Sequence, residues 1–368
     1  MEDKRYPRLL CDLPLLRRNV EEVTRRCHGA GIRVAGVVKG VNAQMPMVEQ
    51  FAKGGCDQLA SSRLDQIERV RAAGFGLPTM LIRIPMMSEL EDVARFCDYS
   101  LESDLSVLEA LNEVCLRQGV RHKVVLMADL GDLREGWWDK DELVAAALRV
   151  ERELPGLELA GIATNLGCWG AIVPTVEKME ELAALALRVE QAIGRELEIV
   201  SGGATTSFRL VHLGTMPAKI NHLRIGEAIL ENYDYKHEWG FTDMDYLSSR
   251  VFTLQAQVVE CRIKPSHPVG QIFVDAFGQR PTYEDKGLRR RALLGIGKLD
   301  MGSSPRILAR DEGVVFLGGA SDHTILDVED CPRPIKAGDI MEFDVAYTEV
   351  LFLTGGAGVT IEYLGADE

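Results

Sequence analysis

The strongest constraint on the fold is an alternation of short apolar runs with helical patterns over the first two-thirds of the chain. Between the runs, apolar residues recur every three or four positions, which is the period of one helix face. The clearest helical pattern is Met179, Leu182, Leu185, Ala186, Val189 and Ile193. The eight apolar runs are 34–38, 57–60, 79–84, 98–101, 123–128, 158–164, 198–201 and 222–225. Eight strands alternating with helices predict an α/β fold, namely a (β/α)8 TIM-type barrel.

The pattern changes beyond residue 244. Val251 to Ile263 alternates loosely, with no helical period, and Gly and Pro punctuate the later apolar runs. These later runs are 271–276, 292–296, 314–317, 324–328, 340–346 and 359–364. They predict a C-terminal all-β domain. We therefore place the barrel domain at 10–244 and the β domain at 245–368, and leave open whether residues 1–9 join the second domain.

Composition excludes several classes of partner. The 368 residues carry a formal net charge of −14, which argues against nucleic acid because phosphate binding needs a basic face. No apolar run approaches the roughly 18 residues of a membrane span. The eight cysteines form no Cys-x-x-Cys pair. We therefore expect a cytoplasmic protein with no membrane partner.

A lysine stands at the end of the first apolar run. Active sites of such barrels form at the C-terminal ends of the strands, and Lys39 directly follows Val37 and Val38. Desolvation at a barrel mouth lowers the pKa of an amine, as a Schiff-base nucleophile requires. The alternative is an ordinary surface lysine at a strand end.

The last two predicted strands also end in informative residues. The segment Ser201 to Ser207 reads Ser-Gly-Gly-Ala-Thr-Thr-Ser. Its backbone N–H groups and hydroxyls suit a phosphate, although a simple helix N-cap loop fits too. Arg224 is unusual in an apolar strand. Its partner is either a carboxylate in the barrel or the pyridine nitrogen of pyridoxal phosphate (PLP), which would stay unprotonated beside an arginine.

Taken in order along the chain, these motifs resemble the alanine racemase superfamily, which is fold type III of PLP enzymes. The resemblance covers nearly the whole chain, and the branch it most resembles is that of ornithine racemase-like amino acid racemases. The motifs that carry it are Asp12–Asn19, Val37–Lys39, Asp129–Gly136, Gly161–Leu166, Ser201–Gly203, Arg224–Gly226, Asp275–Gly278 and Ser321–His323.

The resemblance implies PLP as cofactor and a head-to-tail homodimer with shared active sites. By position, Lys39 would form the Schiff base and Arg134 would lie near the substrate carboxylate. The implied cofactor-binding residues are Lys39, Asn165 against the ring, Thr206 and Ser207 at the phosphate, Arg224 at the pyridine nitrogen, and the N–H groups of Gly226 and Glu227. No metal is expected, because no histidine or cysteine cluster has ligand spacing.

The chain departs from the superfamily at the second catalytic base. Phe277 stands where alanine racemases carry a tyrosine, and phenylalanine cannot move protons. The alternatives are Tyr283, Asp322, His323 and Asp275, contributed by a partner chain. Of these, Asp322 or His323 is favoured, then Tyr283. Since inversion at Cα needs two groups, we expect a PLP-dependent racemase that interconverts L- and D-amino acids by two-base α-proton exchange. Its expected substrate is ornithine or another diamino acid.

Three alternatives remain open. The same fold could host a PLP-dependent decarboxylase or aldolase, which would release CO₂ or an aldehyde. A non-enzymatic PLP carrier is usually a barrel alone, so the β domain argues against it. In a barrel without PLP, Lys39 would be an ordinary lysine.

Overall fold

Eight parallel strands close into a barrel within the stretch Leu16–Leu230, which is one of two compact units of this computed structural model. The strands are β2 (Arg33–Val37), β3 (Gln58–Ser61), β4 (Thr79–Leu81), β5 (Tyr99–Glu102), β6 (His122–Met127), β7 (Leu157–Ala163), β8 (Ile199–Ser201) and β9 (His222–Ile225). Strand β9 pairs with β2 and closes the ring, with Val34 opposite Leu223. The barrel predicted from the eight apolar runs is confirmed. The structure describes residues 5–231, 233–303 and 305–366.

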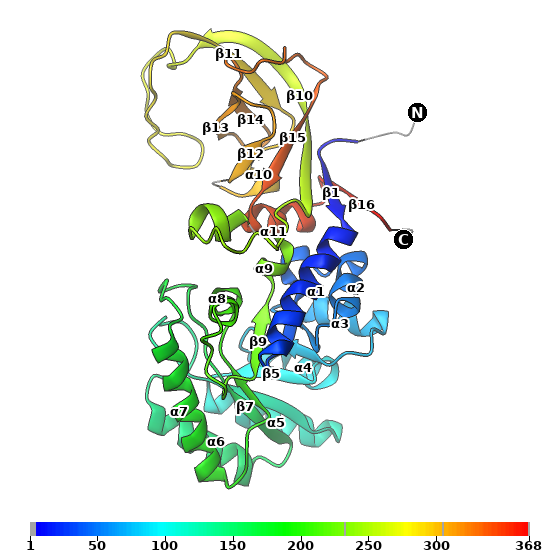
Figure 1. Ribbon diagram of the computed structural model, residues 1–368, viewed down its shortest axis with the longest axis vertical. Coiled ribbons are helices and arrows are strands. Elements are labelled where there is room, and N and C mark those ends of the chain that lie inside the picture. Colours follow the sequence, from blue (N-terminus) through cyan, green and yellow to red (C-terminus); the bar gives the residue numbers. More distant parts are fainter. Residues whose placement is uncertain (1–4, 232, 304, 367–368) are drawn as a thin grey trace. The chain divides into compact units, whose positions relative to one another are not determined.

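Helices cover the outside of the barrel, and Figure 1 shows α6 and α7 running side by side there. The helices are α1 (Leu13–Gly29), α2 (Met45–Lys53), α3 (Leu64–Ala73), α4 (Leu90–Phe96), α5 (Leu105–Gln118), α6 (Lys140–Glu153), α7 (Val176–Ile193), α8 (Phe208–His212) and α9 (Glu227–Leu230). Short 3-10 turns lie at η1 (Val38–Val41), η2 (Met87–Glu89) and η3 (Thr205–Ser207). Helix α7 begins at the N-cap Thr175 and ends at Gly194, whose φ is 80°, as capping residues and C-terminal glycines predict.

Strand residues alternate between two apolar cores, because successive side chains of a strand point to opposite faces. On β6, Val125 and Met127 pack inside the barrel, whereas Val124 and Leu126 pack against the surrounding helices. Burial of each such side chain stabilises the fold by about 1.5–3 kcal/mol. Both faces of every strand are therefore covered, and function is confined to the strand ends.

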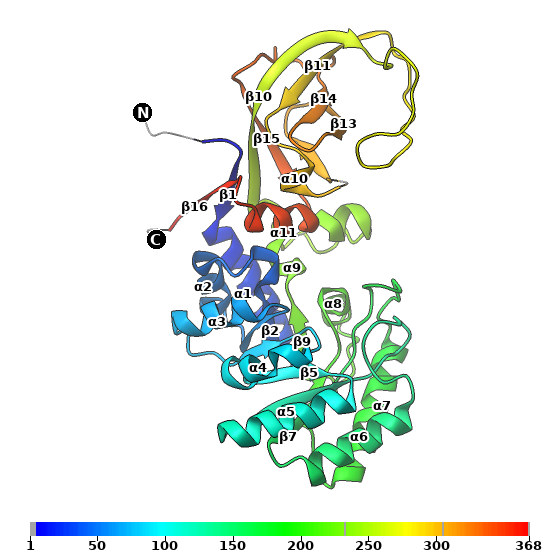
Figure 2. The same cartoon turned by 180° about the vertical axis from the view of Figure 1, so that it is seen from behind.

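The second unit comprises the described residues up to Leu15 and from Glu231 onward. Its strands are β1 (Arg8–Asp12), β10 (Phe252–Pro265), β11 (Leu288–Leu294), β12 (Ile307–Ala309), β13 (Val315–Gly319), β14 (Thr324–Asp327), β15 (Ile340–Val345) and β16 (Thr360–Leu364). Figure 2 shows β10 as a long, curved strand, which pairs with both β11 and β15. The unit also contains α10 (Lys298–Met301), α11 (Tyr347–Gly355) and the π-helical turn η4 (Asp234–Glu238). The predicted all-β C-terminal domain is confirmed.

Strand β1 belongs to this β unit, since it pairs with β10 in antiparallel and with β16 in parallel fashion. The contacts of the chain divide it after Leu15 and after Leu230. The domain limits of 10–244 and 245–368 remain a prediction about folding units.

One predicted strand is wrong. The run 271–276 lies in the connection between β10 and β11, where residues 266–287 form neither helix nor strand. Its side chains are exposed, with Phe273 at 71%. An apolar run makes a strand only where a neighbouring strand can accept its backbone hydrogen bonds, and this segment has no such neighbour among the described residues.

Candidate active site

Lys39 lies in the 3-10 turn η1, two residues beyond the end of strand β2. The chain then bends sharply, because Asn42 and Ala43 both adopt a φ of 47°. This left-handed conformation costs a non-glycine residue about 1–2 kcal/mol. The N–H groups of Asn42 and Ala43 donate back to the carbonyls of Lys39 and Val38 at 3.0 and 3.1 Å. Strain of this kind persists where the surroundings fix it, so Lys39 projects from one defined position.

The third strand and its helix fix this bend. Gln66 donates Nε2–H to Asn42 Oδ1 at 2.9 Å, and Ser61 donates its hydroxyl to Gln66 Oε1 at 2.6 Å. Arg69 donates from Nη2 to the carbonyl of Asn42 at 3.1 Å. Residues from β3 and α3 thus hold the turn that carries the lysine.

The side chain of Lys39 is partly buried and the pKa of its amine is lowered. It makes no hydrogen bond or ion pair with any described residue. Burial lowers its pKa most strongly and Arg134 lowers it further, against the opposing effects of Cys168, Glu135 and Glu227. A lysine with a lowered pKa can serve as nucleophile or base at neutral pH. The lowered pKa is the property that the sequence analysis expected of a Schiff-base lysine at this position.

The loop after β6 closes tightly on itself. Asp129 Oδ1 accepts two N–H groups of the loop, at 2.8 and 3.2 Å. Trp137 returns to β6 and its carbonyl accepts the N–H of Asp129 at 3.1 Å. A Cβ on Gly136 would lie 2.6 Å from the nitrogen of Asp129, so only glycine permits this return. The loop therefore presents its tip, residues 133–135, in a fixed place.

Arg134 and Glu135 form an ion pair at this tip. The Nε and Nη2 of Arg134 donate to the two carboxylate oxygens of Glu135. The Arg134 side chain is 41% exposed and that of Glu135 only 15%. Burial opposes the charge of Arg134, but the hydrogen bond that Arg134 donates to Glu135, together with the charges of Glu135 and Asp132, outweighs burial, and the pKa of Arg134 is raised. Glu135 was not predicted as a site residue from the sequence, although it directly follows the candidate substrate-binding residue Arg134.

A buried carboxylate joins the loops after β6 and β7. Asp132 is 1% exposed and accepts backbone N–H groups from Gly167 at 3.1 Å, Trp169 at 3.0 Å and Ile172 at 3.4 Å. Cys168, which lies between the first two donors, is among the groups that act on the pKa of Lys39. Asp132, hidden within the motif Asp129–Gly136, was also missed because a loop–loop contact leaves no periodic signal.

Arg224 begins a directional chain of hydrogen bonds across the inside of the barrel. Its Nη1 donates to Ser201 Oγ at 2.6 Å and its Nη2 to the carbonyl of Thr164 at 2.9 Å. Ser201 Oγ lies 2.9 Å from His222 Nδ1, and His222 Nε2 lies 3.1 Å from Gln58 Oε1. Burial and the charge of Arg224 hold the pKa of His222 well below its ordinary value, so the imidazole is neutral. The hydrogen-bond pattern then assigns Nδ1 as acceptor and Nε2–H as donor.

The guanidinium of Arg224 is buried without a bonded carboxylate. It is 4% exposed, and no described residue forms an ion pair with it. Burial lowers its pKa to about 10. A buried cation of this kind suits an acceptor that is not part of the protein chain, such as a neutral ring nitrogen.

Asn165 provides a direct test of whether PLP fits. It lies just beyond β7 with 9% of its surface exposed, and its Nδ2 is buried without a hydrogen-bond partner. Buried polar atoms of native proteins almost always have partners. An unsatisfied donor on the same strand edge as Lys39 and Arg224 therefore fits a polar cofactor.

Two positions near the strand ends require glycine because protein atoms lie close to them. Gly203 has a φ of 116°, and a Cβ there would lie 2.8 Å from Ser207 Oγ. A Cβ on Gly226 would lie 3.0 Å from the carbonyl of Val37. The backbone at these two positions carries no side chain, as is common where backbone N–H groups bind a phosphate. The residues present thus fit the cofactor.

The predicted phosphate hydroxyls have protein partners here. Thr206 donates to the carbonyl of Leu166 at 2.9 Å, and Ser207 to the carbonyl of Gly202 at 2.7 Å. A phosphate would be bound by backbone N–H groups, or by these hydroxyls after rotation. Glu227 opens helix α9, and its charge favours the protonated form of Lys39.

The other three predicted site residues lie in the β unit. Asp322 and His323 occupy the tight turn between β13 and β14, where Ala320 N–H donates to the carbonyl of His323 at 2.8 Å. Tyr283 lies in the connection 266–287, 44% exposed, with its ring against His267 at a centroid distance of 6.1 Å. No described contact joins Tyr283 to Asp322 or His323, and their roles remain predictions.

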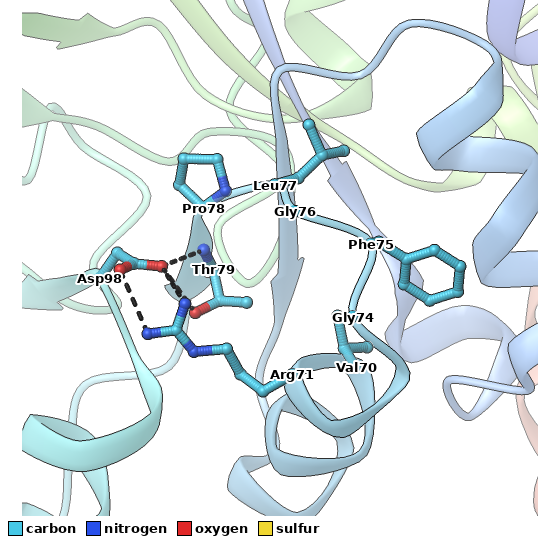
Figure 3. A pocket seen from close by; sticks show the side chains of 9 residues that line it. All are labelled: Val70, Arg71, Gly74, Phe75, Gly76, Leu77, Pro78, Thr79 and Asp98. Atoms are coloured by element: carbon cyan, nitrogen blue, oxygen red, sulfur yellow. Dashed lines mark hydrogen bonds and ion pairs between the residues drawn. The ribbon is translucent and has the colours of Figure 1, made fainter.

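A surface pocket of about 390 Å³ lies away from this site. Figure 3 shows it lined by Gly74 to Pro78, with Arg71 paired to Asp98 and Thr79 at the start of β4. Because active sites of barrels form at the C-terminal ends of strands, a pocket at the beginning of a strand is no candidate for catalysis.

Fold and site together define a class of protein, namely a (β/α)8 barrel with a partly buried lysine just beyond its first strand, followed by a β domain. Comparison with known proteins agrees. The family description "Alanine racemase, N-terminal domain" matches residues 11–233. The chain belongs to the alanine racemase family, whose members are PLP-dependent, and its class is that of amino acid racemases.

Two characterised relatives match nearly the whole chain. An ornithine racemase of Acetoanaerobium sticklandii is 36% identical over 359 residues, 98% of both chains. A lysine racemase of Thermotoga maritima is 37% identical over 347 residues, 94% of this chain and 95% of the relative. The resemblance stated from the motifs is confirmed.

Solved structures share the fold. Alanine racemase from a D-cycloserine-producing Streptomyces lavendulae superposes with a TM-score of 0.74 at 18% identity, covering 98% of both chains. D-threonine aldolase from Filomicrobium marinum superposes with a TM-score of 0.72 at 17% identity, covering 96% of this chain and 90% of the aldolase.

Among the described residues, no helix has the length and apolar character needed to cross a membrane.

Proposed function

We propose that this chain is a PLP-dependent racemase of diamino acids such as ornithine or lysine, acting by two-base exchange of the α-proton. The observation that carries the proposal is Lys39, a partly buried amine with a lowered pKa and no partner among the described residues. The activities named for the two relatives support the choice of substrate.

PLP, when bound, withdraws electrons from the substrate carbon that loses its proton. The protein residues bind, orient and move protons around it. Lys39 anchors the cofactor and then serves as the base on one face of Cα. Arg134 binds the substrate carboxylate. Asn165 and Arg224 hold the ring, while the backbone at Gly203 and Gly226 accommodates the phosphate.

Return of the proton on the opposite face needs a second acid. The candidates are Asp322, His323 and Tyr283, supplied by a second copy of this chain in a homodimer. Exposed apolar side chains in the connection 266–287 support such a partner, since Val269 is 91% and Phe273 71% exposed. Clustered exposed apolar residues are typical of surfaces that another chain covers.

The decisive experiment is proton NMR of PLP-loaded protein in D₂O with a panel of single-enantiomer amino acids. We expect loss of the α-proton signal of ornithine or lysine together with the appearance of the opposite enantiomer on chiral chromatography. Exchange without inversion, or release of CO₂ or aldehyde, would replace the racemase proposal with another PLP reaction.

The shared active site has its own test. A Lys39→Ala variant and a His323→Ala variant, each inactive alone, are mixed and allowed to reassociate. If each site combines residues from both chains, half of the dimers regain one intact site, so activity returns to about a quarter of the wild-type value. No recovery with His323→Ala, Asp322→Ala or Tyr283→Phe as the second variant would rule these candidates out.

A further inference from the structure

The ion pair at the tip of the β6 loop contains a carboxylate that the mechanism above does not use. Glu135 binds both donors of Arg134, the residue expected to receive the substrate carboxylate. Its side chain is 15% exposed against 41% for Arg134. The acid is therefore the more enclosed member of the pair.

The position of this pair is fixed by the protein. Asp129 and Trp137 close the base of the loop, and Asp132 ties the same loop to the one after β7 through three N–H groups. A charge placed on such a loop has little freedom to move into solvent.

The charge of Glu135 reaches the centre of the site. It raises the pKa of Lys39 and, first among the charged neighbours, that of Arg224, in both cases against the larger effect of burial. Among carboxylates, Glu227 also acts on Lys39 but not on Arg224. Glu135 is thus the carboxylate whose charge acts on both the lysine and the buried arginine.

Binding of an amino acid changes the charge balance of the pair. When the substrate carboxylate takes the guanidinium of Arg134, Glu135 loses its partner while it remains mostly enclosed. An enclosed carboxylate without a cation is unfavourable. A second ammonium group on the substrate would restore the balance, whereas an apolar side chain would not.

We propose that Glu135 determines substrate specificity by pairing with the distal ammonium of a diamino acid whose carboxylate is bound by Arg134. This inference rests on the proposed function. The enzyme would distinguish diamino acids from other amino acids by an exchange of ion pairs. Arg134 and Glu135 separate, Arg134 binds the substrate carboxylate, and Glu135 binds the distal ammonium. Amino acids with neutral side chains are disfavoured because they leave Glu135 unpaired.

The test compares substrates that differ only in the distal amine. The kcat/KM values for ornithine and its isostere norvaline, and for lysine and norleucine, are measured for wild type, Glu135→Gln and Glu135→Asp. We expect Glu135→Gln to reduce the ornithine-to-norvaline ratio by about 10²-fold, since the polar site no longer rejects the analogue. The Glu135→Asp variant should retain part of the preference. Glu109→Gln, which removes a surface carboxylate paired with Arg149 at 2.7 Å, is the matched control and should leave the ratio unchanged.

An equal loss for all four substrates would mean that Glu135 only orients Arg134, and would overturn the inference. An unchanged ratio would overturn it as well. Equilibrium dialysis of PLP-loaded protein against labelled ornithine and norvaline separates this inference from the proposed function. Ornithine binding that depends on Glu135 without racemisation would refute only the racemase function, whereas racemisation with an unaltered ratio would refute only the role of Glu135.

Discussion

The two ends of the barrel treat a lysine amine in opposite ways. At the N-terminal end, Glu198 accepts from Tyr99 Oη and Lys123 Nζ, both at 2.7 Å, and lies 3.5 Å from Arg33. At the C-terminal mouth, Lys39 has no partner among the described residues, and Asn165 keeps an unsatisfied buried amide. A fold with no ligand to bind would satisfy both ends alike. The difference indicates that polar groups at the mouth are placed for a ligand.

The largest effect on the contrast between the two ends is expected when the unpaired amine of Lys39 is removed. We expect Lys39→Ala to lower racemisation by about 10³-fold or more, because an acid or base group contributes about 10²–10⁴-fold, and to leave the melting temperature equal or higher. The matched control is Lys53→Ala, which removes an exposed lysine 2.8 Å from Glu49. Normal turnover by Lys39→Ala would refute the catalytic assignment.

Loosening the loop that carries Arg134 and Glu135 should have a smaller effect than removing Lys39. Asp132→Ala leaves three N–H groups without their acceptor, so the loop that carries Arg134 and Glu135 loses its fixed position. We expect kcat/KM to fall by about 10–10²-fold, as small misplacements of catalytic groups do. Asp139→Ala is the control, since it removes only the N-cap of α6 and should reduce stability but not activity. Full activity of Asp132→Ala would show that the hydrogen bonds between Asp132 and the loop after β7 are not needed for catalysis.

Two buried side chains of the barrel, Glu102 and His122, have shifted pKa values, so the stability of the fold should depend on pH. Glu102 is fully buried, and burial raises its pKa to about 8, while burial lowers the pKa of His122 to about 4. Ser100 links them, donating to Glu102 at 2.5 Å and lying 2.9 Å from the imidazole.

The two shifts act in opposite directions on stability. The folded state holds an extra proton on Glu102 between about pH 4.5 and 8 and lacks one on His122 between about pH 4 and 6.5, so their effects cancel up to pH 6.5. Above that, stability falls by up to about 2 kcal/mol as pH rises to 8. Urea unfolding at pH 6.5 and 8 should show this decline in wild type and a smaller one in Glu102→Gln. An equal decline in both would refute the assignment.

The paired end should affect stability alone. Burial opposes ionisation of Glu198, but hydrogen bonds from Lys123 and Tyr99 outweigh it and lower its pKa. Glu198→Gln should therefore lower the free energy of unfolding by about 1 kcal/mol at pH 7, because the site is about a third exposed. The loss should vanish in acid, as the carboxylate of wild type becomes protonated. A change in kcat would contradict the separation of the two ends.

The barrel, the lysine and the family could be read from the sequence because each leaves a local trace. Eight apolar runs matched eight strands, since a strand buried on both faces must be continuously apolar. Lys39 was marked by its place after such a run. Asp132 and Glu135 were not found, because their partners are backbone groups of a distant loop and a neighbouring side chain. The strand predicted at 271–276 is absent, because apolar character alone does not supply a neighbouring strand to accept its hydrogen bonds.

The hydrogen-bond chain inside the barrel makes His222 a built-in reporter. Its Nδ1 accepts a hydrogen bond from the hydroxyl of Ser201, whose oxygen in turn accepts a hydrogen bond from Arg224. Whatever draws Arg224 toward a ligand weakens its hold on Ser201 and changes the electron density at this one nitrogen. A single ¹⁵N resonance of a completely buried imidazole could thus follow the occupancy of the site in solution, with no label placed near the reacting atoms.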